Sequence, residues 1–442
     1  MWLFSTKETN FTRLRLTNLM RKIFFLLLII SNLYSCAITK HRKLKKKTLT
    51  ILSDDFYKNQ FVGFLAIDPA KNDTVVNYNS SKYFTPASNT KIATLYTALN
   101  TLPEKIPALK YLISNDTIYI QGTGDPTLLH PYFKDSTAIN FLKGFENISL
   151  YLNNFEEEKY GPGWAWEDYG YYFQPERNSL PLYGNVVSMY KTDSLHVTPN
   201  HFKGNITEID FHKSREESSN QFYFNPIVKD TLETPFILDS TLTKILLENV
   251  LNKKIAISNT FPEGEKNTLF SVTPDSVYKR MMEVSDNFLA EQLLILSSAT
   301  LSDTLSVTRS QKNILNNQLA DLKQLPRWVD GSGLSRYNLF SPASLVHILT
   351  KMYTEQPKER LFNIFPVGGV SGTLTNWYDG SDQPYIYAKS GSLGNNYCLS
   401  GYLLTKSGKT LIFSFMNNHY KTPTAEVKKR MQAIFENIRD TY

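Results

Sequence analysis

The feature that most constrains the fold is a break in the residue pattern in the middle of the chain. Residues 111–265 are short β-rich pieces with many Asn, Asp, Gly and Tyr residues, whereas the flanks carry well-marked strands and helices. Before the break, β-rich runs at 61–67 and 75–78 are separated by an Asp-Pro and Asn-Asp turn, which predicts a hairpin. Apolar residues then recur at three- and four-residue steps over 89–99, which predicts a helix packed by one face.

After Pro274 the pattern becomes helical and then returns to strands. Helices are expected at 277–282, 288–296, 314–322 and 344–353, strands at 385–388, 397–405 and 410–416, and an amphipathic helix near 427–438. Elements in this order describe an α+β sandwich with an antiparallel sheet. We therefore predict one domain built from residues 51–110 and 266–442, interrupted by a β-rich inserted domain at 111–265.

The charge of the chain is concentrated at its N-terminal end. The 442 residues include 48 Lys and Arg and 41 Asp and Glu, a formal net charge of +7. Residues 1–47 hold eleven of the bases and one acid, which leaves 37 bases and 40 acids elsewhere, a net charge of −3. We therefore expect no surface that follows nucleic-acid phosphates on the body of the protein.

Basic residues followed by an apolar run indicate a targeting signal at 1–36. The run from Ile23 to Ile30 is eight residues long, whereas roughly 20 residues are needed to span a bilayer. It leads to Leu33-Tyr34-Ser35-Cys36, which resembles the bacterial lipobox, in which the Cys is lipidated and becomes the mature N-terminus. We expect a lipid anchor on Cys36 and a cell-envelope location facing the periplasm. The alternative is a buried N-terminal element with an incidental Cys, and Met20 is a second candidate start.

Six Lys and Arg residues between Lys40 and Lys47 follow the expected anchor. They are expected either to form a solvated basic linker at 37–50 or to rest on anionic headgroups.

Cysteine and histidine usage argues against a disulfide framework or a metal centre. The chain has two cysteines, so with Cys36 acylated Cys398 has no partner. None of the seven histidines forms the i, i+4 pair with which one helix face binds zinc. We expect no metal and no cofactor.

Ser88-Asn89-Thr90-Lys91 stands at the start of the predicted helix at 89–99. Positions i and i+3 share a helix face, so the Lys amine reaches the Ser hydroxyl, and the positive helix end disfavours a further ammonium. A Lys kept neutral in this way can act as the base for a Ser nucleophile. Further Ser-x-x-Lys copies at Ser188 and Ser276 are better explained as a strand residue and a helix cap.

Two more polar motifs follow along the chain. Ser285-Asp286-Asn287 separates two helical stretches and on its own is explained as an N-cap. Lys389-Ser390-Gly391 ends a predicted strand, where Gly391 lets a ligand or a backbone approach closely. A second Lys-Ser-Gly at 406–408 lies between two apolar strands and reads as a polar hairpin turn.

In this order and context the three motifs resemble the set shared by penicillin-binding proteins and serine β-lactamases. Segments 122–128 (Gly-Thr-Gly-Asp-Pro-Thr-Leu), 330–336 (Asp-Gly-Ser-Gly-Leu-Ser-Arg) and 366–374 are similar to the D-alanyl-D-alanine carboxypeptidase/endopeptidase family typified by penicillin-binding protein 4. The resemblance covers about residues 50–440 and includes a long insertion between the first two motifs. It implies a DD-peptidase/β-lactamase-like fold. Ser390 stands where the family usually has Thr, and this change keeps the hydroxyl.

The resemblance also implies an acyl-enzyme hydrolase that cleaves the D-Ala-D-Ala bond of peptidoglycan stem peptides and binds β-lactams. Ser88 is then the nucleophile and Lys91 the base that takes its proton, although which group is the acylation base is disputed in this superfamily. Ser285 relays a proton to the leaving group. Asn287 holds Lys91 or the substrate amide.

The same resemblance assigns the recognition of the substrate's ends. Lys389 and Ser390 bind the terminal carboxylate, and backbone N–H groups of Ser88 and Ser392 form the oxyanion hole. Asp168, which follows Trp164-Ala165-Trp166-Glu167, is placed like the family's inserted-domain acid that meets the free amine of the stem peptide's diamino acid. The alternative is that the tryptophans are core of the insertion and Asp168 is a solvated turn residue.

Two other functional classes stay open at this point. A β-lactamase or related esterase would use the same nucleophile, and the long insertion and segment 330–336 argue against it. A non-catalytic cell-wall-binding lipoprotein of the same fold is the second class. The intact Ser88, Lys91, Ser285 and Lys389 argue against that one.

Overall fold

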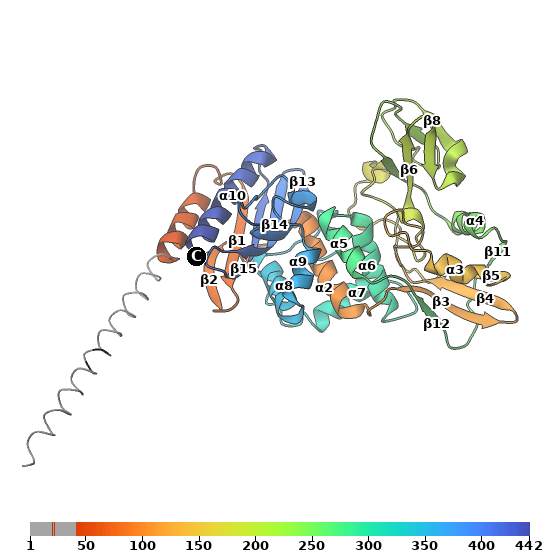
Figure 1. The fold of residues 1–442 in the computed structure, drawn as a ribbon, viewed down its shortest axis with the longest axis horizontal. Coiled ribbons are helices and arrows are strands. Elements are labelled where there is room, and N and C mark those ends of the chain that lie inside the picture. The colour runs from red at the N-terminus through yellow and green to blue at the C-terminus, as the bar shows by residue number, and fades with distance from the viewer. Residues whose placement is uncertain (1–19, 21, 23–40) are drawn as a thin grey trace, which may run out of the picture.

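The structure is a computed structural model that describes Met20, Lys22 and residues 41–442. Apart from Met20 and Lys22, the predicted signal peptide at 1–36, with Cys36, lies outside the described residues. Figure 1 shows a sheet covered by a long C-terminal helix at one end, a layer of helices in the middle and the inserted region at the other end. Within the described part of the chain, no helix is both long and apolar enough to cross a bilayer.

The main sheet is antiparallel and joins the two ends of the described chain. Its strand order is β13-β14-β15-β1-β2. The strands are β1 (Phe61–Asp68), β2 (Asp73–Tyr78), β13 (Ile386–Leu393), β14 (Asn396–Leu404) and β15 (Thr410–Asn418). Phe64 of β1 pairs with Phe415 of β15, and their rings stack at 4.5 Å between centroids. The predicted hairpin and the three predicted C-terminal strands are all present in this sheet.

Both faces of the sheet are buried, which places the site-bearing strand β13 in a rigid layer. Along β15, Phe413 and Phe415 enter a core with α10 (Thr424–Thr441), while Ile412 and Met416 enter a second core with the middle helices. This split follows from the two-residue alternation of side chains along a strand.

The second core is built around a helix that is buried on all sides. It is α6 (Asn287–Ala299), in which every residue from Phe288 onward is buried. Most of its side chains are apolar, as befits an interior helix, and the buried Glu291 and Gln292 are hydrogen-bonded to Ser332 N and to the Gly124 carbonyl. The elements around it are η1 (Ala87–Thr90), α2 (Lys91–Thr101), α5 (Asp275–Glu283), α7 (Val307–Asn316), α8 (Pro342–Glu355) and α9 (Lys358–Ile364). The helix predicted at 314–322 instead lies at 307–316, because Ser306 caps its start by accepting from Arg309 N at 3.2 Å.

The inserted region has its own sheet, helices and core. A five-stranded sheet has the order β11-β5-β4-β3-β12, and two smaller sheets have the orders β10-β6-β7 and β8-β9. The elements are β3 (Pro107–Ser114), β4 (Thr117–Gly122), α3 (Thr137–Lys143), β5 (Asn147–Tyr151), η2 (Trp166–Gly170), η3 (Tyr183–Asn185), β6 (Val186–Lys191), β7 (Leu195–Thr198), η4 (Asn200–Asn205), β8 (Ile206–Glu208), β9 (Phe222–Phe224), β10 (Leu232–Pro235), α4 (Ser240–Leu251), β11 (Ile255–Ile257) and β12 (Asn267–Phe270).

The entering and leaving strands of the insertion are neighbours. Tyr111 of β3 pairs with Asn267 of β12, so this sheet begins at Pro107 and ends at Phe270. The predicted boundaries at 111 and 265 therefore cut β3 and leave out β12. Strand pairing, which composition does not report, sets the true limits.

The prediction of a basic linker at 37–50 does not hold for residues 41–50, which are helical and continue to residue 52. Leu44, Thr48 and Leu52 recur every four residues and are buried, and both leucines belong to the core beneath α10. The bases occupy the exposed faces between them. The segment is thus an amphipathic helix in which a narrow apolar stripe was masked by the density of charge.

We expect Leu52→Ala to lower the free energy of unfolding by about 2–5 kcal/mol, because it removes a buried side chain from this core. Leu301→Ala is the matched control, since that leucine is 42% exposed, and it should change the free energy by less than about 0.5 kcal/mol. Urea unfolding of both variants measures the difference. Equal midpoints would mean that the helix at 41–52 does not dock on the sheet.

Candidate active site

Ser88 lies in the tight turn that opens the helix carrying Lys91. Ala87 has a φ of 50°, in the left-handed region that L-residues rarely adopt, and this turn delivers Ser88 to the helix start. Lys91 is the first residue of α2, and its Nζ donates to Ser88 Oγ at 3.0 Å. The i, i+3 geometry expected from the sequence is therefore present.

Lys91 is held away from water by three oxygen atoms. Besides Ser88 Oγ, its Nζ donates to Asn287 Oδ1 and to the Ser332 carbonyl, each at 2.7 Å. The side chain is fully buried, and burial lowers the pKa of Lys91 to about 8 even though the nearby carboxylates of Asp330, Asp286 and Glu291 favour its charged form. An amine with a pKa near 8 is available as a base close to neutral pH.

The carboxylates behind Lys91 hold its surroundings in place. Asp330 accepts from the backbone N–H groups of Gly333 at 2.8 Å and Ser335 at 2.6 Å, and from the Trp164 indole at 3.0 Å. Glu291 accepts from Ser332 N at 2.8 Å. These bonds fix the loop at 330–335 and so aim the Ser332 carbonyl at the Lys91 amine.

The Ser285-Asp286-Asn287 loop supplies both a helix cap and two site groups. Asp286 caps α6 by accepting from Leu289 N at 3.0 Å. Asn287 uses its oxygen for Lys91 and its Nδ2 for the Phe173 carbonyl at 3.0 Å. The cap and the site function therefore coexist in one loop.

Lys389 is the second fully buried amine of the site. Its Nζ donates to Ser285 Oγ at 2.9 Å and to the Ser390 carbonyl at 2.8 Å. Burial, followed by the charge of Lys91, holds the pKa of Lys389 well below its usual range. Two ammonium groups enclosed together repel each other. The state in which only one of the two lysines is charged is therefore favoured over the state in which both are.

The outer edge of β13 faces the site and leaves backbone donors for a ligand. Ala388 N donates to the Pro366 carbonyl at 3.0 Å, away from the paired strand β14. N–H groups at steps of two along a strand point the same way, and the register of β13 is regular through Ser392. Ser390 and Ser392 therefore direct their N–H groups to this edge.

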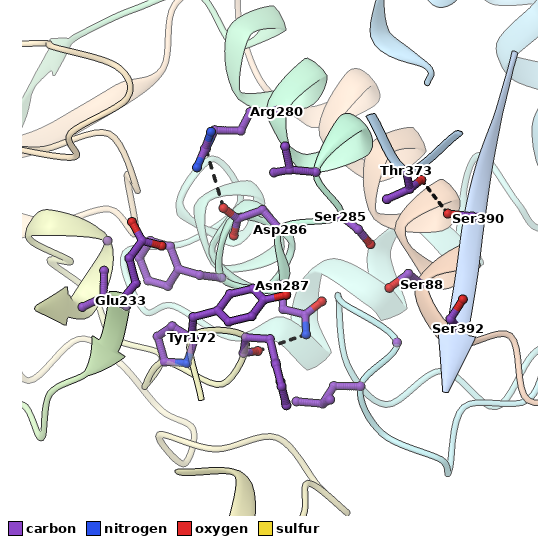
Figure 2. Close-up of a pocket in the computed structure, with 18 of the residues that line it drawn as sticks. Ser88, Tyr172, Glu233, Arg280, Ser285, Asp286, Asn287, Thr373, Ser390 and Ser392 are labelled. Atoms are coloured by element: carbon purple, nitrogen blue, oxygen red, sulfur yellow. Dashed lines mark hydrogen bonds and ion pairs between the residues drawn. The ribbon is translucent and has the colours of Figure 1, made fainter. Parts of the chain in front are cut away.

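A cavity of about 730 Å³ opens over Ser88 (Figure 2). One wall carries Ser88, Ser285, Asn287, Ser390 and Ser392. The other wall comes from the insertion and includes Tyr172, Phe173 and Glu233. Ser390 Oγ lies 2.6 Å from Thr373 Oγ1, so two hydroxyl groups meet beside Lys389 at the edge of β13.

The structure therefore brings together seven of the residues predicted from the three motifs: Ser88, Lys91, Ser285, Asn287, Lys389, Ser390 and Ser392. The other Ser-x-x-Lys copies lie elsewhere, Ser188 in β6 and Ser276 in the first turn of α5, where its hydroxyl donates to Thr273 O at 3.1 Å. Among the described residues, no group of three His, Cys, Asp or Glu side chains is placed to bind a metal ion.

Asp168 does not line this cavity. It lies in η2, where burial and the charge of Glu167 raise its pKa. The two tryptophans do not enclose it as a pair, because the Trp164 indole bonds to Asp330 and Trp166 is 73% exposed. The insertion segment that carries Asp168 nevertheless continues into the cavity wall at Tyr172 and Phe173.

Several contributors to the site were not identified as such from the sequence. Thr373, Ser332 and Phe173 take part through a hydroxyl and two carbonyl groups, and Glu291 holds Ser332 in place. Ser332 and Thr373 do fall within the segments 330–336 and 366–374 that carried the family resemblance. A backbone carbonyl has no residue-type signature, so nothing in the sequence points to Phe173.

Comparison with known proteins agrees with this architecture. A model of the D-Ala-D-Ala carboxypeptidase 3 (S13) family matches residues 44–220 and 241–438. The D-alanyl-D-alanine carboxypeptidase DacB of Haemophilus influenzae is 24% identical over 86% of this chain and 90% of that protein. Penicillin-sensitive carboxypeptidase A of Dictyostelium discoideum is 23% identical over 80% of this chain and 81% of its own length.

A solved structure shares the fold. Penicillin binding protein 4 from Haemophilus influenzae superposes with a TM-score of 0.67 at 20% identity, over 90% of this chain and 98% of that one. The same protein in complex with a β-lactam gives a TM-score of 0.61 at 19% identity. The predicted α+β fold with an additional sheet region is thereby confirmed.

We expect the second-order rate constant for acylation of Ser88 by a chromogenic β-lactam to rise with pH and level off above about 8. The reactive form has a neutral Lys91, so activity is lost as pH falls below its lowered pKa, by about tenfold per pH unit. Stopped-flow measurements from pH 5.5 to 9.5 give the profile.

Lys91→Arg is the control for this profile, because a guanidinium stays protonated over the whole range and should remove the rise together with most of the rate. A wild-type rate that is flat from pH 5.5 to 9.5 would show that Lys91 is not the group that takes the Ser88 proton.

Proposed function

Because the chain belongs to the D-Ala-D-Ala carboxypeptidase 3 family, we propose that it cleaves peptidoglycan stem peptides through an acyl-enzyme on Ser88. As a member of that family it is a serine-type D-Ala-D-Ala carboxypeptidase/endopeptidase. The observation that carries the assignment of roles is the 3.0 Å contact between Ser88 Oγ and a Lys91 amine whose pKa is lowered to about 8.

In the first step neutral Lys91 takes the proton of Ser88, and Ser88 Oγ attacks the carbonyl carbon of the D-Ala-D-Ala bond. The negative charge that develops on the carbonyl oxygen is stabilised by the N–H groups of Ser88 and Ser392. Ser88 lies in the first turn of a helix, where N–H groups have no intrahelical partner, and Ser392 directs its N–H to the free edge of β13.

In the second step the C–N bond breaks and the terminal D-Ala leaves as an amine. The proton it needs comes from Lys91 by way of Ser285, whose hydroxyl also accepts from Lys389. Water then hydrolyses the ester on Ser88: Lys91 accepts the proton of the attacking water and returns it to Ser88 Oγ as the acyl–oxygen bond breaks. Endopeptidase cleavage is the same chemistry with a larger amine as the leaving group.

The substrate's terminal carboxylate binds beside Lys389, Ser390 and Thr373. A carboxylate placed there favours the protonated form of Lys389. The charge gained by Lys389 in turn disfavours a proton on Lys91, since the two amines share one enclosed space. Binding of the correct chain end therefore helps to keep the base neutral. A β-lactam that carries the corresponding carboxylate acylates Ser88 by the same route.

The chain is held at the cell envelope by a lipid on Cys36 and faces the periplasm. Residue 41, already helical, follows Cys36 by five residues, a tether that reaches at most about 18 Å. The bases on the exposed faces of the helix at 41–52 then lie within reach of anionic headgroups.

Ser88→Ala should abolish penicillin labelling and lower peptidase activity by several orders of magnitude while leaving the fold intact, because it removes only the nucleophile. Ser188→Ala and Ser276→Ala are the controls and should retain wild-type activity. Fluorescent-penicillin gels and release of D-Ala report the two readouts. Loss of activity in Ser276→Ala with retention in Ser88→Ala would reverse the assignment of the nucleophile.

Cys36→Ser should move the protein from the membrane fraction to the soluble fraction with catalysis unchanged, because a lipid chain is the proposed anchor. Fractionation after a high-salt wash, followed by penicillin labelling of both fractions, tests this. A mutant that stays with the membranes after the wash rules out lipidation of Cys36 as the anchor.

Asp168 lies outside the cavity, on the segment that continues into its wall at Tyr172 and Phe173, and we propose that it meets the free amine of the stem peptide's diamino acid beyond that wall. Asp168→Asn should then weaken turnover of stem peptides with this free amine by about ten- to a hundredfold, because a charged hydrogen bond contributes about 1.5–3 kcal/mol. N-acylated analogues of the same peptides should be nearly unaffected. Values of kcat/KM on both substrates separate the outcomes, and equal losses on both would mean that Asp168 supports the fold.

A further inference from the structure

We infer that a hollow beside the active-site cavity binds the glycan strand of peptidoglycan, the acetamido-sugar polymer to which stem peptides are attached. The hollow has a volume of about 660 Å³ and lies in the insertion, between the segment at 167–172 and residues of β9, β10 and 209–215. The inference rests on the proposed function, because it places the remainder of the same substrate.

The hollow adjoins the cavity over Ser88. Tyr172 and Glu233 line both. Figure 2 shows these two residues on the opposite side of the cavity from Ser390, beside which the substrate's terminal carboxylate binds. A stem peptide that lies with its carboxyl end at Ser390 therefore runs toward Tyr172 and Glu233. Its other end, which joins the sugar polymer, leaves the cavity at the hollow.

The lining of the hollow is rich in aromatic side chains that are open to solvent. Tyr171 is 57% exposed, Tyr172 is 65% exposed and Phe211 is 41% exposed. Tyr171 is stacked on Phe173 with the ring planes 5° apart, and Phe211 packs on Tyr223 at 4.5 Å between centroids. The rings are thus held in position by neighbours while parts of their surfaces stay uncovered. Aromatic rings fixed in this way suit the aliphatic C–H faces of pyranose sugars, whose hydroxyl groups face the polar surroundings.

The charge of the lining fits a neutral polymer. The guanidinium of Arg215 is buried and donates hydrogen bonds to the carbonyls of Pro235 and Glu216, at 2.8 and 2.6 Å. Lys213 lies 3.9 Å from Glu216. Glu167 and Glu233 add negative charge to the same surface. With Lys213 and Arg215 against Glu167 and Glu233, the lining carries no net charge, and hydroxyl and acetamido groups find both donors and acceptors on it.

The test uses the full-length chain and two substrates with the same peptide: a free stem pentapeptide ending in D-Ala-D-Ala, and that pentapeptide carried on a chain of two or more disaccharide units. We expect Phe211→Ala to raise KM about tenfold for the glycan-borne substrate and to leave its kcat unchanged. Both kcat and KM for the free pentapeptide should stay at their wild-type values. Tyr190→Ala is the matched control. Tyr190 is 40% exposed, stacks on His196 and lies in the insertion outside the hollow.

Binding is measured separately in the Ser88→Ala background, by titrating a neutral oligomer of N-acetylglucosamine, which carries the acetamido sugar without a lactyl carboxylate, into the protein with and without Phe211→Ala. Suppose the wild-type chain turns over both substrates and Phe211→Ala changes neither KM nor glycan binding. That result would overturn the inference and leave the proposed function standing. A Tyr190→Ala effect equal to that of Phe211→Ala would also overturn it. Absence of turnover on either substrate by the wild-type chain would instead contradict the proposed function.

Discussion

The whole site depends on how closely two backbone segments approach the turn that carries Ser88. A Cβ at Gly391 of β13 would lie 2.5 Å from the Pro86 carbonyl, and a Cβ at Gly333 would lie 1.9 Å from the Ala87 carbonyl. Gly333 also has a φ of 83°, which favours glycine. Only with hydrogen at both positions can the sheet edge and the loop at 330–335 approach Ser88 from two sides. Every distance within the site follows from this close packing.

Close packing excludes water, and the exclusion of water sets the chemistry of the two lysines. Lys91 and Lys389 are both fully buried and exchange hydration for a few fixed oxygen atoms. Desolvation is the leading cause of the lowered pKa at each. One of them can therefore serve as a base while the other offers a binding place for a carboxylate. On an open surface both lysines would stay protonated near neutral pH, and neither could serve as the base.

The insertion is a structural part of this site and extends its reach. Three hydrogen bonds come from its segment at 153–179. The Phe173 carbonyl accepts from Asn287, and the Trp164 indole donates to Asp330. The Arg177 guanidinium donates to Glu291 at 3.4 Å. These contacts join the inserted region to the groups that surround Lys91. The same segment then forms one side of the hollow beside the cavity. A polymer substrate can thus be held well beyond the bond that is cleaved.

The sequence by itself determined the parts of the protein that are written in local patterns. Alternation and helical periodicity predicted the five strands of the main sheet and most of its helices, and three short motifs picked out Ser88, Lys91, Ser285, Asn287 and Lys389. Local charge density misled the prediction for 41–50, because a stripe of one buried residue in four is weak beside so many bases. Only the tertiary structure decided the limits of the insertion, the participation of Thr373 and the Phe173 carbonyl, and the position of Asp168 outside the cavity. These features depend on strand pairing and on contacts between residues more than a hundred positions apart in some cases, such as Asn287 and Phe173. Such contacts leave no periodic trace in either segment, since a carbonyl group can be supplied by any residue type.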